Sequence, residues 1–274
     1  MMGTVVDWLQ RGRWGLVAGG IALAVLGGCA TPGGTTSSDG SDIVTASDET
    51  ETHRRARIRL ELAASYYERG QLTVALDEIK RALAIEPNYA DAFNLRGLVF
   101  MRMDDYGLAE ESFRRAMALR PSDPDVAHNY GWLLCQQKKF AEADQHFERA
   151  LAQRNYTARS KTYMAQGLCH DAAGQASQAE QALLKSYELD PGNPVVAYNL
   201  ALLLQRRGDL TRAQFYIRRL NNSELANAQS LWLGIKIERA LGSDVAMRQL
   251  GEQLQKRFPE SRELGAYKRR AFDE

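Results

Sequence analysis

The sequence predicts an all-α protein in which helix-turn-helix units stack along one axis. Three observations predict this fold. Small residues recur from residue 53 onward with a period of about 34, a length typical of helical repeats. Large apolar residues accompany them at helical spacing, and glycine, proline or asparagine separates the helices. Hydrophobic residues make up 45% of the 274 positions, which is enough to bury a core along the whole array.

Each predicted unit needs small residues where its two helices cross, large apolar residues beside them and a turn-forming residue at its end. The second unit shows this pattern most clearly, with Gly97, Phe100, Ala109, Phe113, Ala116 and Pro121. The first unit has Leu62, Ala63, Tyr66, Gly70, Ala75, Ile79, Ala82 and Pro87. The third unit continues with Gly131, Leu134, Ala143, Phe147 and Ala150. These three units keep one register.

The fourth unit begins two residues late, at Gly167, and Asn155 stands where the third unit should close with proline. Residues 153–160 are therefore predicted to form an enlarged turn. The fourth and fifth units contain Gly174, Ala179, Leu183, Pro191, Ala201, Leu204, Gly208, Ala213 and Ile217. The degenerate sixth unit contains Gly234, Ile237, Gly242, Ala246, Leu250 and Pro259. Residues 260–274 offer one more amphipathic helix, with Leu264, Tyr267 and Phe272, which we expect to cap the last unit.

This period and this placement of small residues are those of the tetratricopeptide repeat. Residues 53–274 are therefore predicted to form a right-handed superhelix of about six such repeats with a C-terminal capping helix. A coiled coil is excluded, because turn residues interrupt every half-repeat and a heptad seam tolerates no such breaks.

Residues 1–28 have the features of a lipoprotein signal peptide. Arg11 and Arg13 precede an apolar stretch at residues 14–26, which is shorter than the roughly 20 residues that a transmembrane helix needs. The sequence Leu-Gly-Gly-Cys follows at residues 26–29 and resembles a lipobox, so Cys29 is the predicted lipid-attachment residue. A chance cysteine behind an ordinary signal peptide is the alternative. Ala30 rather than aspartate comes next, which by resemblance to enteric lipoproteins implies the periplasmic face of the outer membrane.

Residues 29–52 are predicted to form an acylated, flexible tether between the membrane and the repeats. They are rich in Gly, Ser, Thr and Asp and contain few large apolar side chains to bury. A flexible chain of this length has a root-mean-square reach of about 25 Å, which holds a domain just off a membrane surface.

The charge balance favours protein partners. Removal of residues 1–28 takes away Arg11, Arg13 and Asp7 and leaves equal numbers of basic and acidic side chains. A neutral chain without a basic block is not expected to bind nucleic acid, which needs concentrated positive charge. The repeats contain no phosphate-binding or zinc-protease motif, so we predict no enzyme activity, no cofactor and no small-molecule substrate.

The histidines and the two remaining cysteines suggest no metal site. His53 lies in the tether region, and the others, on separate predicted helices, are His128, His146 and His170. No spacing among them is typical of metal ligands. Cys135 and Cys169 are expected on neighbouring helices of adjacent units. Two small buried residues are the preferred interpretation, although an oxidising compartment would also permit a disulfide, and their spacing does not decide between the two.

Binding is predicted on the concave face of the superhelix, which the first helix of each unit lines. One equivalent position is apolar in units two to six, and we call these residues the concave stripe: Leu98, Trp132, Leu168, Leu202 and Ile235. The predicted protein-binding groove adds Leu60, Tyr67, Asn94, Met101, Arg102, Cys135, Met164, Tyr198 and Arg206. An apolar floor with scattered Arg and Asn suits an extended or helical peptide.

Ordinary packing between helices is the alternative interpretation of the concave stripe. A second alternative is a clamp for a peptide carboxylate around Asn129 and Asn199. The lysines that would complete such a clamp are missing, so we do not favour it.

Several segments resemble the lipoproteins of type IV pilus biogenesis, the pilotins of the PilF and PilW group. Residues 128–140, HNYGWLLCQQKKF, resemble the third unit of that family, and Arg159 and Ser160 occupy its enlarged turn. Residues 228–236, AQSLWLGIK, and residues 254–259, LQKRFP, resemble its sixth unit. The resemblance extends over nearly the whole chain.

The resemblance implies a function. It implies that the protein binds the secretin subunit of the type IV pilus, escorts it to the outer membrane and promotes its assembly into a multimeric ring. The N-terminal end of the groove is our first choice for this contact, because it lies close to the tether. The alternative is a periplasmic scaffold for peptidoglycan enzymes or for outer-membrane protein assembly, which the repeat pattern does not exclude.

Overall fold

The computed structural model describes residues 49–273, and over this range the chain contains thirteen helices and no strand. The helices are α1 (Glu51–Glu68), α2 (Leu72–Ile85), α3 (Ala90–Arg102), α4 (Tyr106–Leu119), α5 (Pro124–Gln136), α6 (Phe140–Leu151), α7 (Arg159–Ala172), α8 (Ala176–Leu189), α9 (Pro194–Arg206), α10 (Leu210–Asn221), α11 (Ala228–Ala240), α12 (Asp244–Arg257) and α13 (Arg262–Arg269). The predicted all-α class is confirmed.

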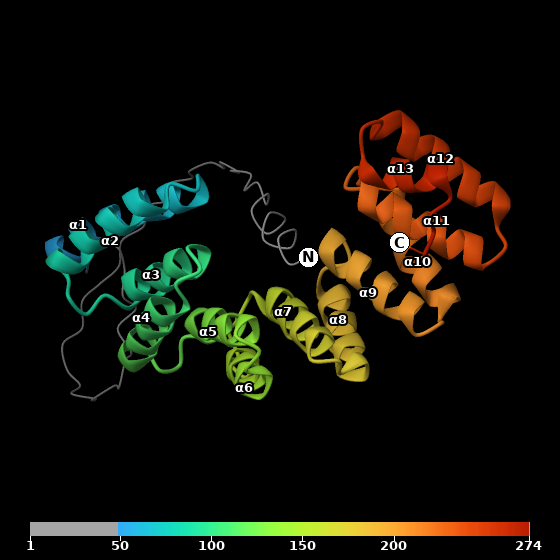
Figure 1. Cartoon of the computed structure of the whole chain (residues 1–274). Coiled ribbons are helices and arrows are strands. Elements are labelled where there is room, and N and C mark those ends of the chain that lie inside the picture. The colour runs from blue at the N-terminus through green and yellow to red at the C-terminus, as the bar shows by residue number, and fades with distance from the viewer. Residues whose placement is uncertain (1–48, 274) are drawn as a thin grey trace, which may run out of the picture.

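Consecutive helices pack as pairs, from α1 with α2 to α11 with α12, and each pair contacts the next one along the chain. Figure 1 shows the pairs stacked into an arch, with α3, α5, α7 and α9 toward its inner side and α4, α6, α8 and α10 toward its outer side. The six predicted repeats are therefore present, and α13 follows the sixth as the predicted cap.

Small residues let the two helices of a pair approach closely. A Cβ atom added to Gly97 on α3 would lie 2.6 Å from the ring of Phe113 on α4. The same addition to Gly167 on α7 would lie 2.7 Å from Leu183 on α8. Neither distance is compatible with a side chain, so these glycines set how closely the helices cross.

The turn inside each pair contains one residue with a left-handed backbone. Glycine occupies this position in four pairs, at Gly70, Gly174, Gly208 and Gly242. Asp104 and Lys138 occupy it in the second and third pairs, with φ of 60° and 62°. The six positions are evenly spaced apart from the step between Lys138 and Gly174, which is two residues longer.

The longer step reflects the enlarged turn between α6, which ends at Leu151, and α7, which begins at Arg159. Tyr156 is buried in this turn, where its hydroxyl lies 2.7 Å from Thr162 Oγ1. His128 Nδ1 lies 2.9 Å from the same oxygen. Hydrogen bonds and burial therefore hold the enlarged turn against both of its neighbouring pairs.

The core is a series of apolar clusters along the arch rather than one centre. The last cluster joins Leu231 and Ile235 of α11 to Leu254 of α12 and Leu264 of α13, all of them buried. The capping helix therefore covers the apolar face of the sixth repeat, as the sequence predicts.

The predicted signal peptide, Cys29 and most of the predicted tether lie outside the described residues. Helix α1 starts at Glu51 with Thr50 as its N-cap, two residues before the predicted boundary. His53 thus belongs to α1, where its Nδ1 lies 2.7 Å from Glu86 Oε2, and not to the tether region. Among residues 49–273, no helix is long and apolar enough to cross a membrane.

Candidate functional site: the inner face of the arch

Four residues of the concave stripe line successive first helices. Leu98, Trp132, Leu168 and Leu202 lie on α3, α5, α7 and α9, and each is half-buried against the core clusters beneath it. They pack and remain partly exposed at the same time. The stripe therefore supplies apolar surface along the inner face while it also closes the core.

The fifth residue of the stripe does not reach this surface. Ile235 is fully buried, because α12 and α13 enclose it with Leu254 and Leu264. Its assignment to the stripe was wrong. The capping helix covers, in the sixth repeat, the position that stays partly exposed in repeats two to five.

Met164 also differs from the prediction. It is 4% exposed and packs in the cluster that contains Leu183, Val196 and Leu200. Its side chain fills the space between the fourth and fifth repeats and does not line the groove. Tyr198, from the same predicted set, stays half-buried at the edge of that cluster.

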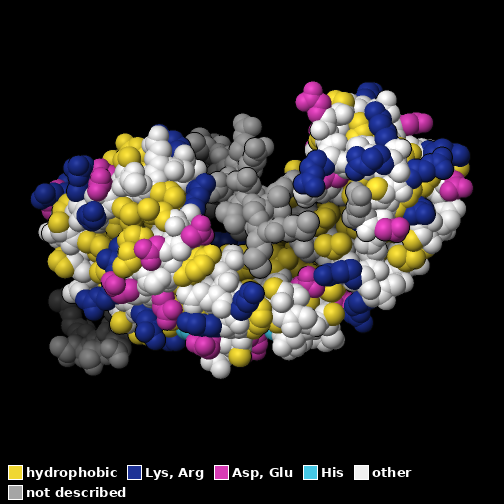
Figure 2. All heavy atoms as spheres, viewed as in Figure 1, with side chains coloured by type: hydrophobic (Ala, Val, Ile, Leu, Met, Phe, Trp, Pro, Cys, Tyr) yellow, Lys and Arg dark blue, Asp and Glu magenta, His cyan; other side chains and the backbone are white. Residues whose placement is uncertain are grey.

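The N-terminal end of the inner face carries a group of partly exposed apolar residues. Leu60 and Tyr67 of α1, with Leu98 and Met101 of α3, are all half-buried. Figure 2 shows hydrophobic side chains gathered over the first helices of the chain. We call these four residues the N-terminal apolar patch; the structure leaves each of them partly exposed.

The polar residues predicted above the stripe join repeats to one another. Arg102 Nη1 donates to the carbonyl oxygen of Tyr67 at 2.9 Å, and its guanidinium lies 5.4 Å from the centre of that ring. Asn129 Nδ2 donates to Asn94 Oδ1 at 3.0 Å. Each contact links one first helix to the preceding one. Sequence reasoning missed this structural role.

Arg206 forms the corresponding link between the fourth and fifth repeats. Its Nη2 lies 2.6 and 2.8 Å from the two carboxylate oxygens of Asp171 on α7. In the contacts of both Arg102 and Arg206, the arginine follows its acceptor by 35 residues, about one repeat. This spacing is the sequence signal that would have revealed them.

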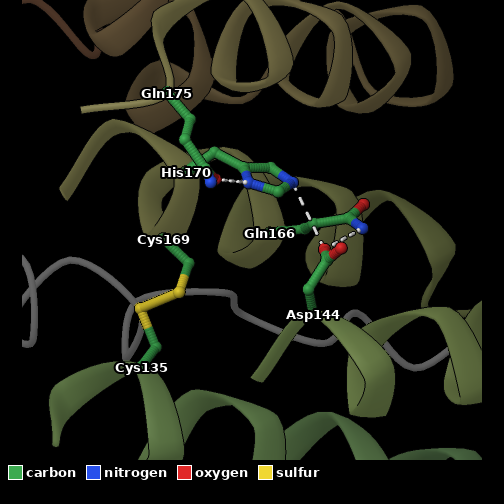
Figure 3. Close-up of a disulfide and its surroundings, with 6 residues drawn as sticks. All are labelled: Cys135, Asp144, Gln166, Cys169, His170 and Gln175. Carbon is green, nitrogen blue, oxygen red and sulfur yellow. Dashed lines mark hydrogen bonds and ion pairs between the residues drawn. A yellow bond between two sulfur atoms is a disulfide. The ribbon is translucent and has the colours of Figure 1, made fainter. Parts of the chain in front are cut away.

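A disulfide joins α5 to α7 through Cys135 and Cys169, whose Cα atoms are 5.8 Å apart (Figure 3). This corrects the preferred interpretation of two unlinked buried thiols. The bond ties the third repeat to the fourth, the two repeats that the enlarged turn connects. Its position next to Trp132 places a covalent staple beside the groove.

A polar network lies near the disulfide. His170 Nδ1 is 2.7 Å from Gln175 Oε1, and its Nε2 is 3.2 Å from Asp144 Oδ1, to which Gln166 also donates (Figure 3). These groups satisfy one another and join α6 to α7. In the described part of the chain, no group of three or more His, Cys, Asp or Glu side chains is arranged to hold a metal ion.

The stacked helix pairs and their partly apolar inner face define a tetratricopeptide repeat protein. Family models described as tetratricopeptide repeat match residues 88–155, 131–194 and 182–215, and one described as TPR repeat matches residues 63–104. The chain belongs to the family of the type IV pilus assembly protein PilF. It is 31% identical to PilF of Pseudomonas aeruginosa over 204 residues, which is 74% of this chain and 81% of that protein.

Two structures from this family are similar over most of their length. The structure of Pseudomonas aeruginosa PilF has a TM-score of 0.71 and 28% identity, and the match covers 81% of this chain and 100% of that one. The structure of PilW, described as a widely conserved type IV pilus biogenesis factor, has a TM-score of 0.72 and 30% identity, with 78% and 98% covered. The resemblance to type IV pilus biogenesis proteins is thereby confirmed.

Proposed function

We propose that this protein is a lipoprotein of the outer membrane that binds the type IV pilus secretin subunit and promotes its localisation and assembly. Membership of a type IV pilus assembly family supports the pilus as the setting. The lipobox-like sequence at Cys29 supports the anchor. Inner faces of helical repeats are the usual binding surfaces of such proteins, which supports a protein partner.

The observation that carries the proposal is the alignment of apolar side chains along the inner face. Leu98, Trp132, Leu168 and Leu202 stand in equivalent places on four consecutive first helices and stay partly exposed. A segment of the secretin that presents apolar side chains at regular intervals would fill this row. The N-terminal apolar patch is the preferred entry, because the tether leads to α1.

The test substitutes partly exposed residues of the concave stripe and measures folding beside binding. We expect Leu98→Asp or Trp132→Ala to weaken a purified secretin complex about thirtyfold or more, since a buried hot-spot residue costs at least about 2 kcal/mol on removal. Affinity measured by surface plasmon resonance gives the result. Circular dichroism on the same samples shows whether the helices persist.

Leu108→Asp is the matched control, because Leu108 is 40% exposed on α4, a second helix of its pair. It introduces the same charge away from the inner face and should leave binding unchanged. If Leu98→Asp loses helical content together with binding, the stripe is ordinary packing. If both inner-face variants bind and assemble secretin normally, the groove is elsewhere.

Pull-down from detergent-solubilised envelopes compares the proposed partner with the alternative one. Recovery of secretin supports the proposal. Recovery of a cell-wall hydrolase or an outer-membrane insertion factor in its place would favour the scaffold.

A further inference from the structure

A second candidate binding site lies at the other end of the arch. It is a cavity of about 390 Å³ between α9, α11 and the last described residues, and its lining consists of Gln205, Lys236, Arg239, Ala240, Phe272 and Asp273. Beyond α13 the chain turns at Arg270, which has φ of 55°, and runs back toward α11. Figure 1 shows α11, α12 and α13 together at the C-terminal end of the arch.

Phe272 builds one wall of the cavity. Its ring stacks on Trp232 of α11, with ring centres 5.5 Å apart and planes inclined by 19°. The Arg239 guanidinium lies 4.1 Å from the centre of the Phe272 ring. The aromatic stack therefore holds the arginine at the edge of the cavity, with one flat face covered.

Two arginines of earlier repeats donate hydrogen bonds to acceptors of a kind that Arg239 lacks within the described part of the chain. Arg102 and Arg206 end their first helices and donate to Tyr67 and Asp171 of the preceding repeat. Arg239 lies in the last turn of α11, at the position that Asp171 and Gln205 hold in the two preceding repeats, while Ala240 holds the position of Arg206. Among the described residues, the Arg239 guanidinium forms no hydrogen bond or ion pair, and it lies over the Phe272 ring.

Among the described residues, two basic side chains and one acidic side chain line the cavity. Lys236 lies one turn before Arg239 on α11, and Asp273 is the one acidic residue of the lining. Figure 2 shows Lys and Arg side chains gathered over α11 to α13. Such a surface attracts carboxylates and holds them in a site that is partly shielded from solvent.

We propose that this cavity binds a carboxylate side chain in an acidic segment of a protein partner. Arginine recognises a carboxylate through its N–H donors, and the Arg206–Asp171 pair shows such a contact within this same protein. The incoming carboxylate takes the role that Asp171 has for Arg206. The Phe272 ring supplies an apolar surface for the adjoining part of the peptide. This site goes beyond the secretin contact proposed above and uses none of its residues.

The experiment uses the full chain in detergent and a fluorescein-labelled peptide, Gly-Asp-Glu-Phe-Asp-Glu with an amidated C-terminus, and records fluorescence anisotropy. We expect saturable binding that weakens between 50 and 500 mM NaCl, because salt screens a partly exposed pair (Debye length falling from about 13 to about 4 Å). The Arg239→Gln variant should bind about tenfold more weakly or worse, since a charge-assisted contact is lost. The neutral peptide Gly-Asn-Gln-Phe-Asn-Gln should not bind.

Arg248→Gln is the matched control, because Arg248 is an exposed arginine of α12 that does not line the cavity. It removes the same charge and should change the affinity less than twofold. Equal losses in both variants would mean unspecific attraction and overturn the proposal. So would equal binding of the neutral peptide, or no saturable binding at all.

Two further measurements distinguish an acidic peptide from an acidic lipid and this cavity from the secretin groove. Vesicles containing phosphatidylglycerol, sedimented with each variant, test a membrane surface as the acidic ligand. If Arg239→Gln abolishes vesicle binding and the peptide does not bind, the site recognises lipid and the proposal is wrong. Leu98→Asp should retain peptide binding, so a failure of the secretin proposal does not affect this test.

Discussion

At the scale of the single residue, His128 shows how burial fixes a charge state. It lies between the third and fourth repeats, 5% exposed, with its Nδ1 beside the Thr162 hydroxyl. Burial, together with the positive charge of Lys161, lowers the pKa of His128 to about 3. The side chain therefore stays neutral in the folded protein at any physiological pH, and its role is structural.

This burial predicts that the protein loses stability in mild acid. In the unfolded chain the imidazole takes up a proton as the pH falls below about 6.5, whereas in the folded protein it does so only near pH 3. The unfolded state binds more protons throughout that window, so the free energy of unfolding falls as the pH falls. From pH 7 to pH 5 this one group should cost about 2 kcal/mol.

Urea unfolding at pH 7, 6 and 5, followed by circular dichroism, measures the effect. His128→Gln does not titrate and keeps an acceptor for Thr162, so it should remove about 2 kcal/mol of the pH dependence. An unchanged slope in this variant would show that other groups cause the acid sensitivity. His146, whose pKa is also lowered by burial, then becomes the first candidate.

At the scale of the element, the turn inside each helix pair shows what the backbone requires. Four pairs place glycine at the left-handed position, whereas the second and third place Asp104 and Lys138 there. A residue with a Cβ atom in this region costs about 1 to 2 kcal/mol. The second and third turns are therefore strained in comparison with the other four.

Substitution at these turns should change stability in opposite directions. Gly208→Ala should destabilise by about 1 kcal/mol, and the cause is the backbone alone, because a Cβ atom there meets nothing within 4 Å. Lys138→Gly should stabilise by about 0.5 kcal/mol, since the relief of strain exceeds the entropy that the unfolded chain gains. Urea midpoints of both variants against the parent protein give the result. Equal signs would contradict a left-handed turn at one of the two positions.

The helix pairs could be predicted from sequence because their signals are local. The second and fourth pairs each place a glycine of the first helix against a large apolar residue of the second, Gly97 against Phe113 and Gly167 against Leu183. The spacing of these residues is the same in both pairs, because the two helices cross in the same way. The enlarged turn followed from the same register, because the fourth unit comes late.

Contacts between repeats were harder to predict, since nothing local marks them. The helical period places Met164 on an inner face but does not tell whether the next pair covers it. Pairing of Cys135 with Cys169 depends on the distance between α5 and α7, which two positions in a sequence do not fix. The roles of Arg102 and Arg206 were missed for the same reason.

At the scale of the whole molecule, the proposed function relies on a lipid anchor at Cys29 to place the arch at a membrane. Cys29 lies outside the described residues, so the lipid anchor rests on the sequence at residues 26–29. Several acyl chains, at about 0.8 kcal/mol per buried methylene, hold a protein on a membrane with negligible release. We therefore expect Cys29→Ser to leave the protein soluble or unprocessed.

Fractionation of cells that express the wild type and Cys29→Ser, followed by mass spectrometry of the mature N-terminus, measures the effect. Lipid on the wild-type cysteine and its loss in the variant are the expected results. An unmodified wild-type N-terminus would show that the apolar stretch is an ordinary signal and that the arch is not anchored by lipid.

The staple between α5 and α7 makes the mechanical stiffness of the arch uneven. Each helix pair contacts mainly its neighbours. Any bending of such a repeat array is therefore expected at the junctions between consecutive pairs. At the junction between the third and fourth repeats, the Cys135–Cys169 disulfide links the two repeats, and the buried Tyr156 side chain packs in the connecting turn. We therefore expect bending to concentrate in the junctions on either side of this one. For a partner that contacts both ends of the arch, the stiffness of those junctions would then set how strongly the two ends hold it.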